Sequence, residues 1–168
     1  NYLTRLASLA QLRLLANEQT DTYADDITRL TMEVITTSQV PAQDDDPEWI
    51  AADLDEGLLA KLLVLRILVN GLRGMSTRDT SAEALAALRT SATPPYKLLN
   101  GLITRQGDLS VEGSTMPKYY QAHLRLAAGK LILKLARDRT LDRFLSAANF
   151  SRLSSLCQDK RPEVREHF

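Results

Sequence analysis

The stretch that most constrains the fold is residues 124–136, which read L-R-L-A-A-G-K-L-I-L-K-L-A. As a helix, this stretch carries apolar side chains on more than one face. A helix of that kind is stable only when other helices surround it. One stripe comprises Leu124, Ala127, Ala128, Leu131 and Leu135, and a second comprises Leu126, Gly129, Leu133 and Ala136. The remainder of the chain must therefore supply several neighbouring helices.

Gly129, at the centre of this stretch, indicates a close contact. A glycine inside a helix costs about 0.5–1 kcal/mol relative to alanine. The Gly129-Lys130 pair does not form a phosphate-binding loop, because Leu124 stands where that motif needs a glycine and Leu131 where it needs Ser or Thr. Small residues on a helix form a low ridge that a crossing helix can approach. The sequence therefore predicts that another helix packs against Gly129.

The rest of the chain also predicts helices and no strand. Aromatic residues make up only 5%, so leucine and alanine must fill the core, and this bias favours helices. Pro94-Pro95 is expected to end one helix and begin another, and Gly74 to end a helix. Helices are expected over 2–16, from about 21, over 55–72, 81–89 and 96–106, from 117, and in shorter pieces over 140–145, from 146 and from 162.

Two segments match the second helix of a HEAT repeat. The tail fits D-x-x-P-x-V-R, and the central helix fits V-R-x-A-A, with the two arginines 40 residues apart. That spacing is close to one HEAT period of about 40–47 residues. In such arrays an aspartate caps a helix and an arginine reaches the aspartate of the next repeat. The sequence therefore predicts an all-α fold, an α-solenoid of HEAT-type helical hairpins. Its structural positions are Arg125, Ala127, Ala128, Gly129, Asp159, Pro162, Val164 and Arg165.

An ordered set of motifs resembles one family of HEAT proteins. LRLAAGKLILKLARD and FLSAANFSRLSSLCQDKRPEVREHF resemble the cohesion regulators named for precocious dissociation of sisters. LLAKLLVLRILVNGLRG and QGDLS lie upstream in the family's order, and Trp49 falls where the family has a tryptophan in an acidic loop. The matches span about residues 6–168. Residues 79–96 are longer than the family's connection at that place.

The resemblance implies a function in sister-chromatid cohesion. It implies a HEAT-repeat protein of the nucleus and chromatin that binds cohesin through its kleisin subunit and works with the wings-apart-like release factor. Residues 1–168 would form a single segment of a longer array, with a loop at 36–54 and a connection at 73–95. The absence of an initiator Met fits an internal fragment. No partner-binding residue is carried over from the family.

The basic residues of the C-terminal half are the main candidates for partner binding. They could contact DNA phosphates or an acidic protein segment, or they could be an ordinary solvated helix edge. Trp49 could anchor a partner or fold onto its own helix pair. The candidates are Lys130, Lys134, Arg137, Arg139, Arg143 and Trp49.

The sequence does not favour an enzyme, a metal site or a cofactor. His123 and His167 have no carboxylate or thiol at ligand spacing, and the run Asp44 to Asp46 is expected to be solvated. Cys157 is interpreted as a core thiol in a reducing compartment. The apolar run at 58–69 is too short and too charged to span a membrane.

Two alternatives to a cohesin regulator remain. One is another HEAT scaffold, such as a transport or phosphatase-regulatory solenoid. The other is a helical nucleic-acid-binding domain that uses the basic C-terminal half. Residues 1–56 carry 3 basic and 12 acidic side chains, whereas residues 117–168 carry 11 and 5. The two ends of the chain therefore present opposite charge.

Overall fold

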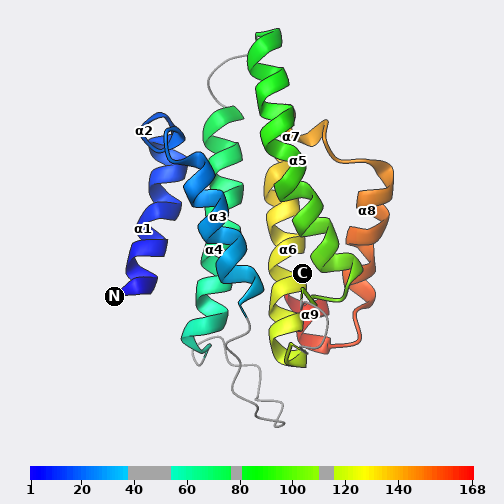
Figure 1. Cartoon of the computed structure of the whole chain (residues 1–168). Coiled ribbons are helices and arrows are strands. Elements are labelled where there is room, and N and C mark those ends of the chain that lie inside the picture. The colour runs from blue at the N-terminus through cyan, green and yellow to red at the C-terminus, as the bar shows by residue number, and fades with distance from the viewer. Residues whose placement is uncertain (38–53, 77–80, 110–115) are drawn as a thin grey trace.

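A computed structural model describes residues 1–37, 54–76, 81–109 and 116–168. These residues form helices and contain no strand, which confirms the all-α prediction (Figure 1). The longer helices are α1 (Tyr2–Leu15), α3 (Ala24–Thr36), α4 (Glu56–Ser76), α5 (Ala82–Thr104) and α6 (Lys118–Ala136). The shorter ones are α2 (Asn17–Asp21), α7 (Arg139–Asp142), α8 (Ala147–Ser154), the 3₁₀ turn η2 (Ser155–Gln158) and α9 (Pro162–His167).

The helices pair as hairpins whose second members stand next to one another. The end of α3 contacts the start of α4. Figure 1 shows that α3 and α4, and likewise α5 and α6, run in opposite directions, so each pair is antiparallel. Helix α4 packs on α1 and on α6, and α6 packs in turn on α9. This arrangement of α1, α4, α6 and α9 is the stacked layer expected of a helical-repeat array. Figure 1 shows α1, α4 and α6 side by side.

The core lies between these layers and consists mainly of aliphatic side chains. Helix α6 carries buried residues on more than one face, as its sequence predicts, because α4, α5 and α9 all contact it. The largest fully buried side chains are Ile35, Leu58, Leu65, Ile67, Leu99, Leu102, Leu124, Ile132, Leu135, Leu141, Val64 and Val69.

Lys61 is a buried cation that joins α3 to α4. Only 3% of the residue is exposed. Its Nζ donates hydrogen bonds to the carbonyl oxygens of Val34 (2.8 Å), Ile35 (2.7 Å) and Thr37 (2.9 Å). The last carbonyls of a helix have no hydrogen-bond partners within the helix. A lysine at this end donates to them, and its positive charge interacts favourably with the helix dipole. Burial lowers the pKa of the Lys61 ammonium group.

Two predicted helix boundaries are wrong. Helix α4 does not end before Gly74 but continues to Ser76. Gly74 is a glycine because α1 packs closely against it. A Cβ at Gly74 would lie 2.6 Å from the carbonyl oxygen of Arg13 and 2.9 Å from Cβ of Asn17. Glycine is needed there for close packing and not for a turn.

The predicted break at Pro94-Pro95 is also wrong, because α5 passes through both residues. Most of the predicted connection at 73–95 is accordingly helical. Each interior proline removes a helix hydrogen bond and costs about 3 kcal/mol or more. Tertiary packing offsets that cost: Pro95 and Tyr96 are buried, and the Tyr96 hydroxyl donates a 2.9 Å hydrogen bond to the carbonyl oxygen of Leu141.

The turn after α5 places the start of α6. Gln106 (φ 57°) and Gly107 (φ 90°) both adopt positive φ. The Gly107 N–H donates to the carbonyl oxygen of Leu102, and the Gln106 N–H to that of Ile103. This pair of bonds is a Schellman motif, which satisfies the terminal carbonyls of a helix. A Cβ at Gly107 would collide with the backbone of Gln121, so the turn packs directly on α6.

Candidate partner-binding surface

A groove lies along the surface between α4 and α6, and we call it the α4–α6 groove. It encloses about 360 Å³. Its floor is apolar, and its remaining residues bear basic nitrogen groups. Because it is an open groove at the small end of ligand-site volumes, its size suits an anchoring side chain better than a whole cofactor. The lining residues are Leu54, Leu62, Arg66, His123, Leu126, Ala127, Lys130, Leu131 and His167.

Helix geometry explains why these residues meet. On α4, Leu62 and Arg66 are one turn apart and therefore lie on the same face. On α6, Ala127 and Lys130 are three residues apart, and Leu131 lies one turn beyond Ala127. Because α4 packs on α6, the two faces join along one line.

The basic charge continues beyond the groove. Burial and the neighbouring charges of Arg73 and Arg66 lower the pKa of the Lys134 ammonium group. Arg66 and Arg73 are seven residues apart on α4, and Lys130 and Lys134 are four apart on α6. Two basic pairs from different helices thus form one positively charged strip. Such a strip attracts anionic partners.

The predicted basic residues divide between this strip and a neighbouring segment. Lys130 lines the groove and Lys134 continues the strip. Arg137 is the C-cap of α6, whereas Arg139 begins α7 and Arg143 caps its end. All five are exposed, but of these five Lys130 alone lines the groove. Trp49 and the Asp44 to Asp46 run lie outside the described residues.

His123 is buried at the floor of the groove, with 7% exposure. Its ring meets that of Tyr119 edge-on, with the centroids 5.1 Å apart. Burial lowers the pKa of His123 to about 4, with smaller contributions from the charges of Arg161 and His167. The imidazole is therefore neutral near pH 7.

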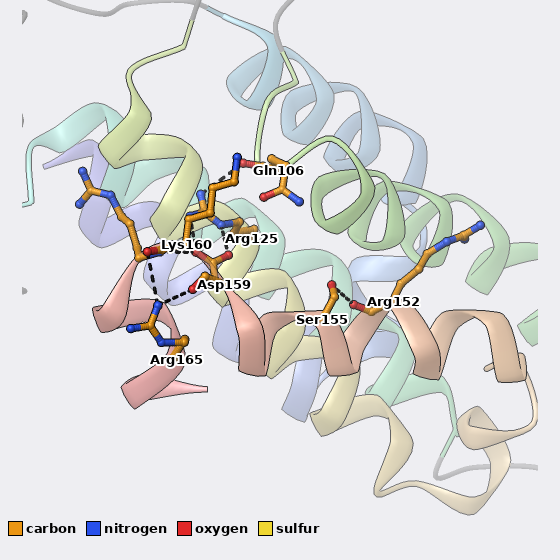
Figure 2. Close-up of polar contacts among 8 residues, drawn as sticks. Gln106, Arg125, Arg152, Ser155, Asp159, Lys160 and Arg165 are labelled. Carbon is orange, nitrogen blue, oxygen red and sulfur yellow. Dashed lines mark hydrogen bonds and ion pairs between the residues drawn. The ribbon is translucent and has the colours of Figure 1, made fainter.

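Arg125 and Asp159 form a buried ion pair between the two predicted repeat units (Figure 2). The Arg125 Nε and Nη2 atoms donate to the two carboxylate oxygens at 2.6 and 2.7 Å. Arg125 Nη1 also donates to the Gln106 carbonyl oxygen at 3.3 Å. This fork-shaped pairing is the strong geometry for an arginine and a carboxylate. It joins α6 and the α5–α6 turn to the segment before α9.

Asp159 also organises the start of α9. Its Oδ1 accepts a 2.9 Å hydrogen bond from the Arg161 N–H, and its backbone carbonyl accepts one of 2.5 Å from Arg165 Nη1. Burial alone would raise the pKa of the Asp159 carboxyl, but the hydrogen bonds from Arg125 and Arg161 and the charges of Arg125 and Arg165 hold it below its ordinary value. The carboxylate therefore stays ionised although it is buried.

Gly129 lies where α6 meets the C-terminal segment. A Cβ at this position would collide with Cδ1 of Leu156 and lie 2.8 Å from Cε2 of Phe168. This geometry agrees with the close-contact interpretation of the sequence. The other predicted repeat positions lie as follows. Ala128 and Val164 are fully buried in the core. Ala127 borders the groove, and Pro162 begins α9.

Comparison with known proteins decides the family. The family model described as sister chromatid cohesion protein PDS5 matches residues 1–168. The chain belongs to the PDS5 family. It is 34% identical over 168 residues to the sister chromatid cohesion protein pds5 of Schizosaccharomyces pombe, a match that covers 98% of this chain and 13% of that protein.

Other PDS5 relatives match over similar lengths. Identity is 31% over 158 residues to the PDS5 protein of Saccharomyces cerevisiae, covering 88% of this chain and 12% of that protein. The chain is 25% identical over 169 residues to PDS5 homolog A of Mus musculus, a match that covers 99% of this chain and 12% of that protein. The chain thus spans about an eighth of the length of these curated relatives.

Cys157 of this PDS5-family chain is not the core thiol that the sequence predicts. The side chain is exposed. Residues 155–158 form the turn η2, in which Leu156 takes the buried position, with 2% exposure, and points toward Gly129. The neighbouring cysteine therefore faces outward. The apolar residues around Cys157 in the sequence do not reveal which of them faces inward in a 3₁₀ turn.

Sequence reasoning missed the contribution of α4 to the basic strip. Arg66 and Arg73 are about sixty residues from Lys130 in the chain, and only the packing of α4 on α6 brings them together. Their spacing of seven residues is a signal that they share one helix face. Within the described ranges, no cluster of three or more His, Cys, Asp or Glu side chains could hold a metal ion. None of the helices there is long and apolar enough to cross a bilayer.

Proposed function

We propose that this chain is a non-catalytic HEAT-repeat scaffold within a cohesin-associated regulator in the nucleus. The regulator binds the kleisin subunit of cohesin, works with the wings-apart-like release factor, and controls maintenance and release of sister-chromatid cohesion. Residues 1–168 would form one segment of a longer array. The observation that carries the proposal is the match of the PDS5 family model over all 168 residues.

The packing of the chain supports a scaffold role. Its helices stack as hairpins, and the buried pair of Arg125 and Asp159 links successive units. Repeat arrays of this kind are stabilised mainly by contacts between neighbouring units and present long surfaces for partners. The α4–α6 groove is one such surface.

Co-purification tests the proposal. The full-length protein carrying this chain, with an affinity tag, is isolated from nuclear extract and probed for the kleisin and the wings-apart-like factor. We expect both to co-purify, and the kleisin to persist when the release factor is depleted. Recovery of the folded protein without any cohesin subunit would contradict the proposal and favour a HEAT scaffold of another pathway.

DNA binding is a second candidate, favoured by the strip formed by Arg66, Arg73, Lys130 and Lys134. A protein that neutralises several phosphates loses affinity steeply as salt rises. The test is the affinity of the full-length protein for duplex DNA at several salt concentrations. A steep fall of DNA affinity with salt that becomes shallower in the Lys130→Glu variant would support this function. An unchanged slope in that variant would exclude the strip as a DNA-binding site.

A further inference from the structure

The α4–α6 groove combines an apolar floor with positive charge. Its floor includes Leu62, Leu126 and Leu131, and Arg66 and Lys130 stand among them. Among the described residues that line the groove, none is acidic. In the described part of the chain, neither Arg66 nor Lys130 takes part in an ion pair within 4.0 Å.

The arrangement of these charges is elongated and not clustered around one point. Lys134 extends the line of Lys130 by one turn of α6, and Arg73 extends that of Arg66 by two turns of α4. The effect of Arg66 and Arg73 on the pKa of Lys134 places all three in one electrostatic neighbourhood. A partner that matched this strip would have to carry several negative charges in a row beside its apolar side chains.

We propose that the α4–α6 groove docks a short acidic amphipathic segment of a partner protein, with apolar side chains on the leucine floor and carboxylates along Arg66, Lys130 and Lys134. Charge complementarity selects this occupant. A neutral apolar peptide would leave the cations beside it unmatched, and DNA would leave the apolar floor unused. Helix-in-groove binding uses this combination of apolar anchors and charged flanks.

This inference deepens the proposed scaffold function and rests on it, because it assigns a partner-binding site to this segment of the array. Binding should depend on both features of the groove. Rim charges mainly set the association rate and the salt dependence, whereas buried apolar anchors set the residence time.

A designed peptide tests the chemistry of the groove directly. The probe is a fluorescently labelled synthetic helix with leucines at i, i+3, i+4 and i+7 and glutamates at the flanking positions. Its binding to the full-length protein is followed by fluorescence anisotropy. We expect measurable binding that weakens as salt rises, and that weakens about tenfold or more in the double variant Arg66→Glu/Lys130→Glu.

Matched controls separate the groove from general electrostatics. The double variant Arg5→Glu/Arg89→Glu makes the same change of charge at exposed positions outside the groove and should bind as the parent does. A second peptide of identical composition, with its leucines scattered around the helix, should bind at least tenfold more weakly. Thermal melts of both double variants show whether each remains folded.

The other outcomes either overturn the docking proposal or separate it from the proposed cohesin function. Equal binding of the two peptides, together with competition by duplex DNA, would identify a polyanion surface. Equal loss in both double variants would mean that net charge and not the groove governs binding. If cohesin co-purifies with the full-length protein and the peptide binds nowhere, the groove assignment fails while the proposed function stands. If the peptide binds as expected and no cohesin subunit co-purifies, the docking site stands and the cohesin function fails.

Discussion

Replacing Asp159 by alanine should be one of the most damaging single changes in this chain. Arg125 and Asp159 are 6% and 7% exposed, and two hydrogen bonds of 2.6 and 2.7 Å join them. Asp159→Ala leaves the guanidinium buried without its counter-ion. Breaking a buried pair in this way typically costs about 3–5 kcal/mol. The loss of the hydrogen bond to the Arg161 N–H adds to that cost.

Urea unfolding of the full-length protein and its variants measures the effect, with the transition of this segment followed by hydrogen exchange of α6 and α9. We expect a loss of about 3–5 kcal/mol for Asp159→Ala. The double variant Arg125→Met/Asp159→Leu should recover much of the stability, because replacing both charges by apolar groups removes the unpaired charge. The coupling between the two sites in this cycle should exceed about 1.5 kcal/mol.

An exposed ion pair in the same chain is the matched control. Arg29 and Asp26 are 2.7 Å apart, and their side chains are 79% and 66% exposed. Asp26→Ala should therefore cost no more than about 0.5 kcal/mol. Equal effects of Asp26→Ala and Asp159→Ala would refute the argument that burial makes the Arg125–Asp159 pair important.

Three further predictions concern glycine packing, the buried lysine and pH. In thermal melts, Gly129→Leu should destabilise the fold by about 1–3 kcal/mol and Gly129→Ala should destabilise it by less. Gly101→Ala should stabilise the fold by about 0.5–1 kcal/mol, because the added Cβ would meet no neighbouring atom within 4 Å. Lys61→Met should cost about 2–3 kcal/mol in urea unfolding, because it leaves helix-terminal carbonyls without donors. The pKa of His123 falls from 6.5 to about 4 on folding, so the unfolded chain binds more protons than the folded chain between these pH values. The free energy of unfolding should therefore fall by up to about 3 kcal/mol as pH drops from 7 to 4. In a pH titration of unfolding, His123→Gln should remove this contribution.

The overall fold could be predicted because its signals are local or periodic. The two apolar stripes of residues 124–136 require neighbours on several sides, and α4, α5 and α9 supply them. The Asp and Arg positions of the repeat pattern predict a contact between units. In the structure Arg125 pairs with Asp159, which lies 34 residues further along the chain. Ser146 and Pro162 mark helix starts correctly because capping chemistry is local.

The details that depend on distant packing could not be predicted. Nothing near Pro94 in the sequence shows that Tyr96 bonds to Leu141, yet such packing keeps α5 continuous. Gly74 reads as a helix stop until α1 is placed against it. For the same reason the sequence predicts only the α6 half of the basic strip, because the charge of Arg66 acts on Lys134 only when α4 packs on α6.

The most direct test of the proposed function measures sister-chromatid pairing in living cells. A fluorescently marked chromosomal locus is scored for separated sister signals in cells arrested before anaphase, after the endogenous full-length protein has been depleted. We predict that depletion increases separated sisters, that wild-type protein restores pairing, and that the Asp159→Ala protein restores it poorly. Unchanged pairing after depletion verified by immunoblot would contradict the proposal that this PDS5-family protein maintains sister-chromatid cohesion.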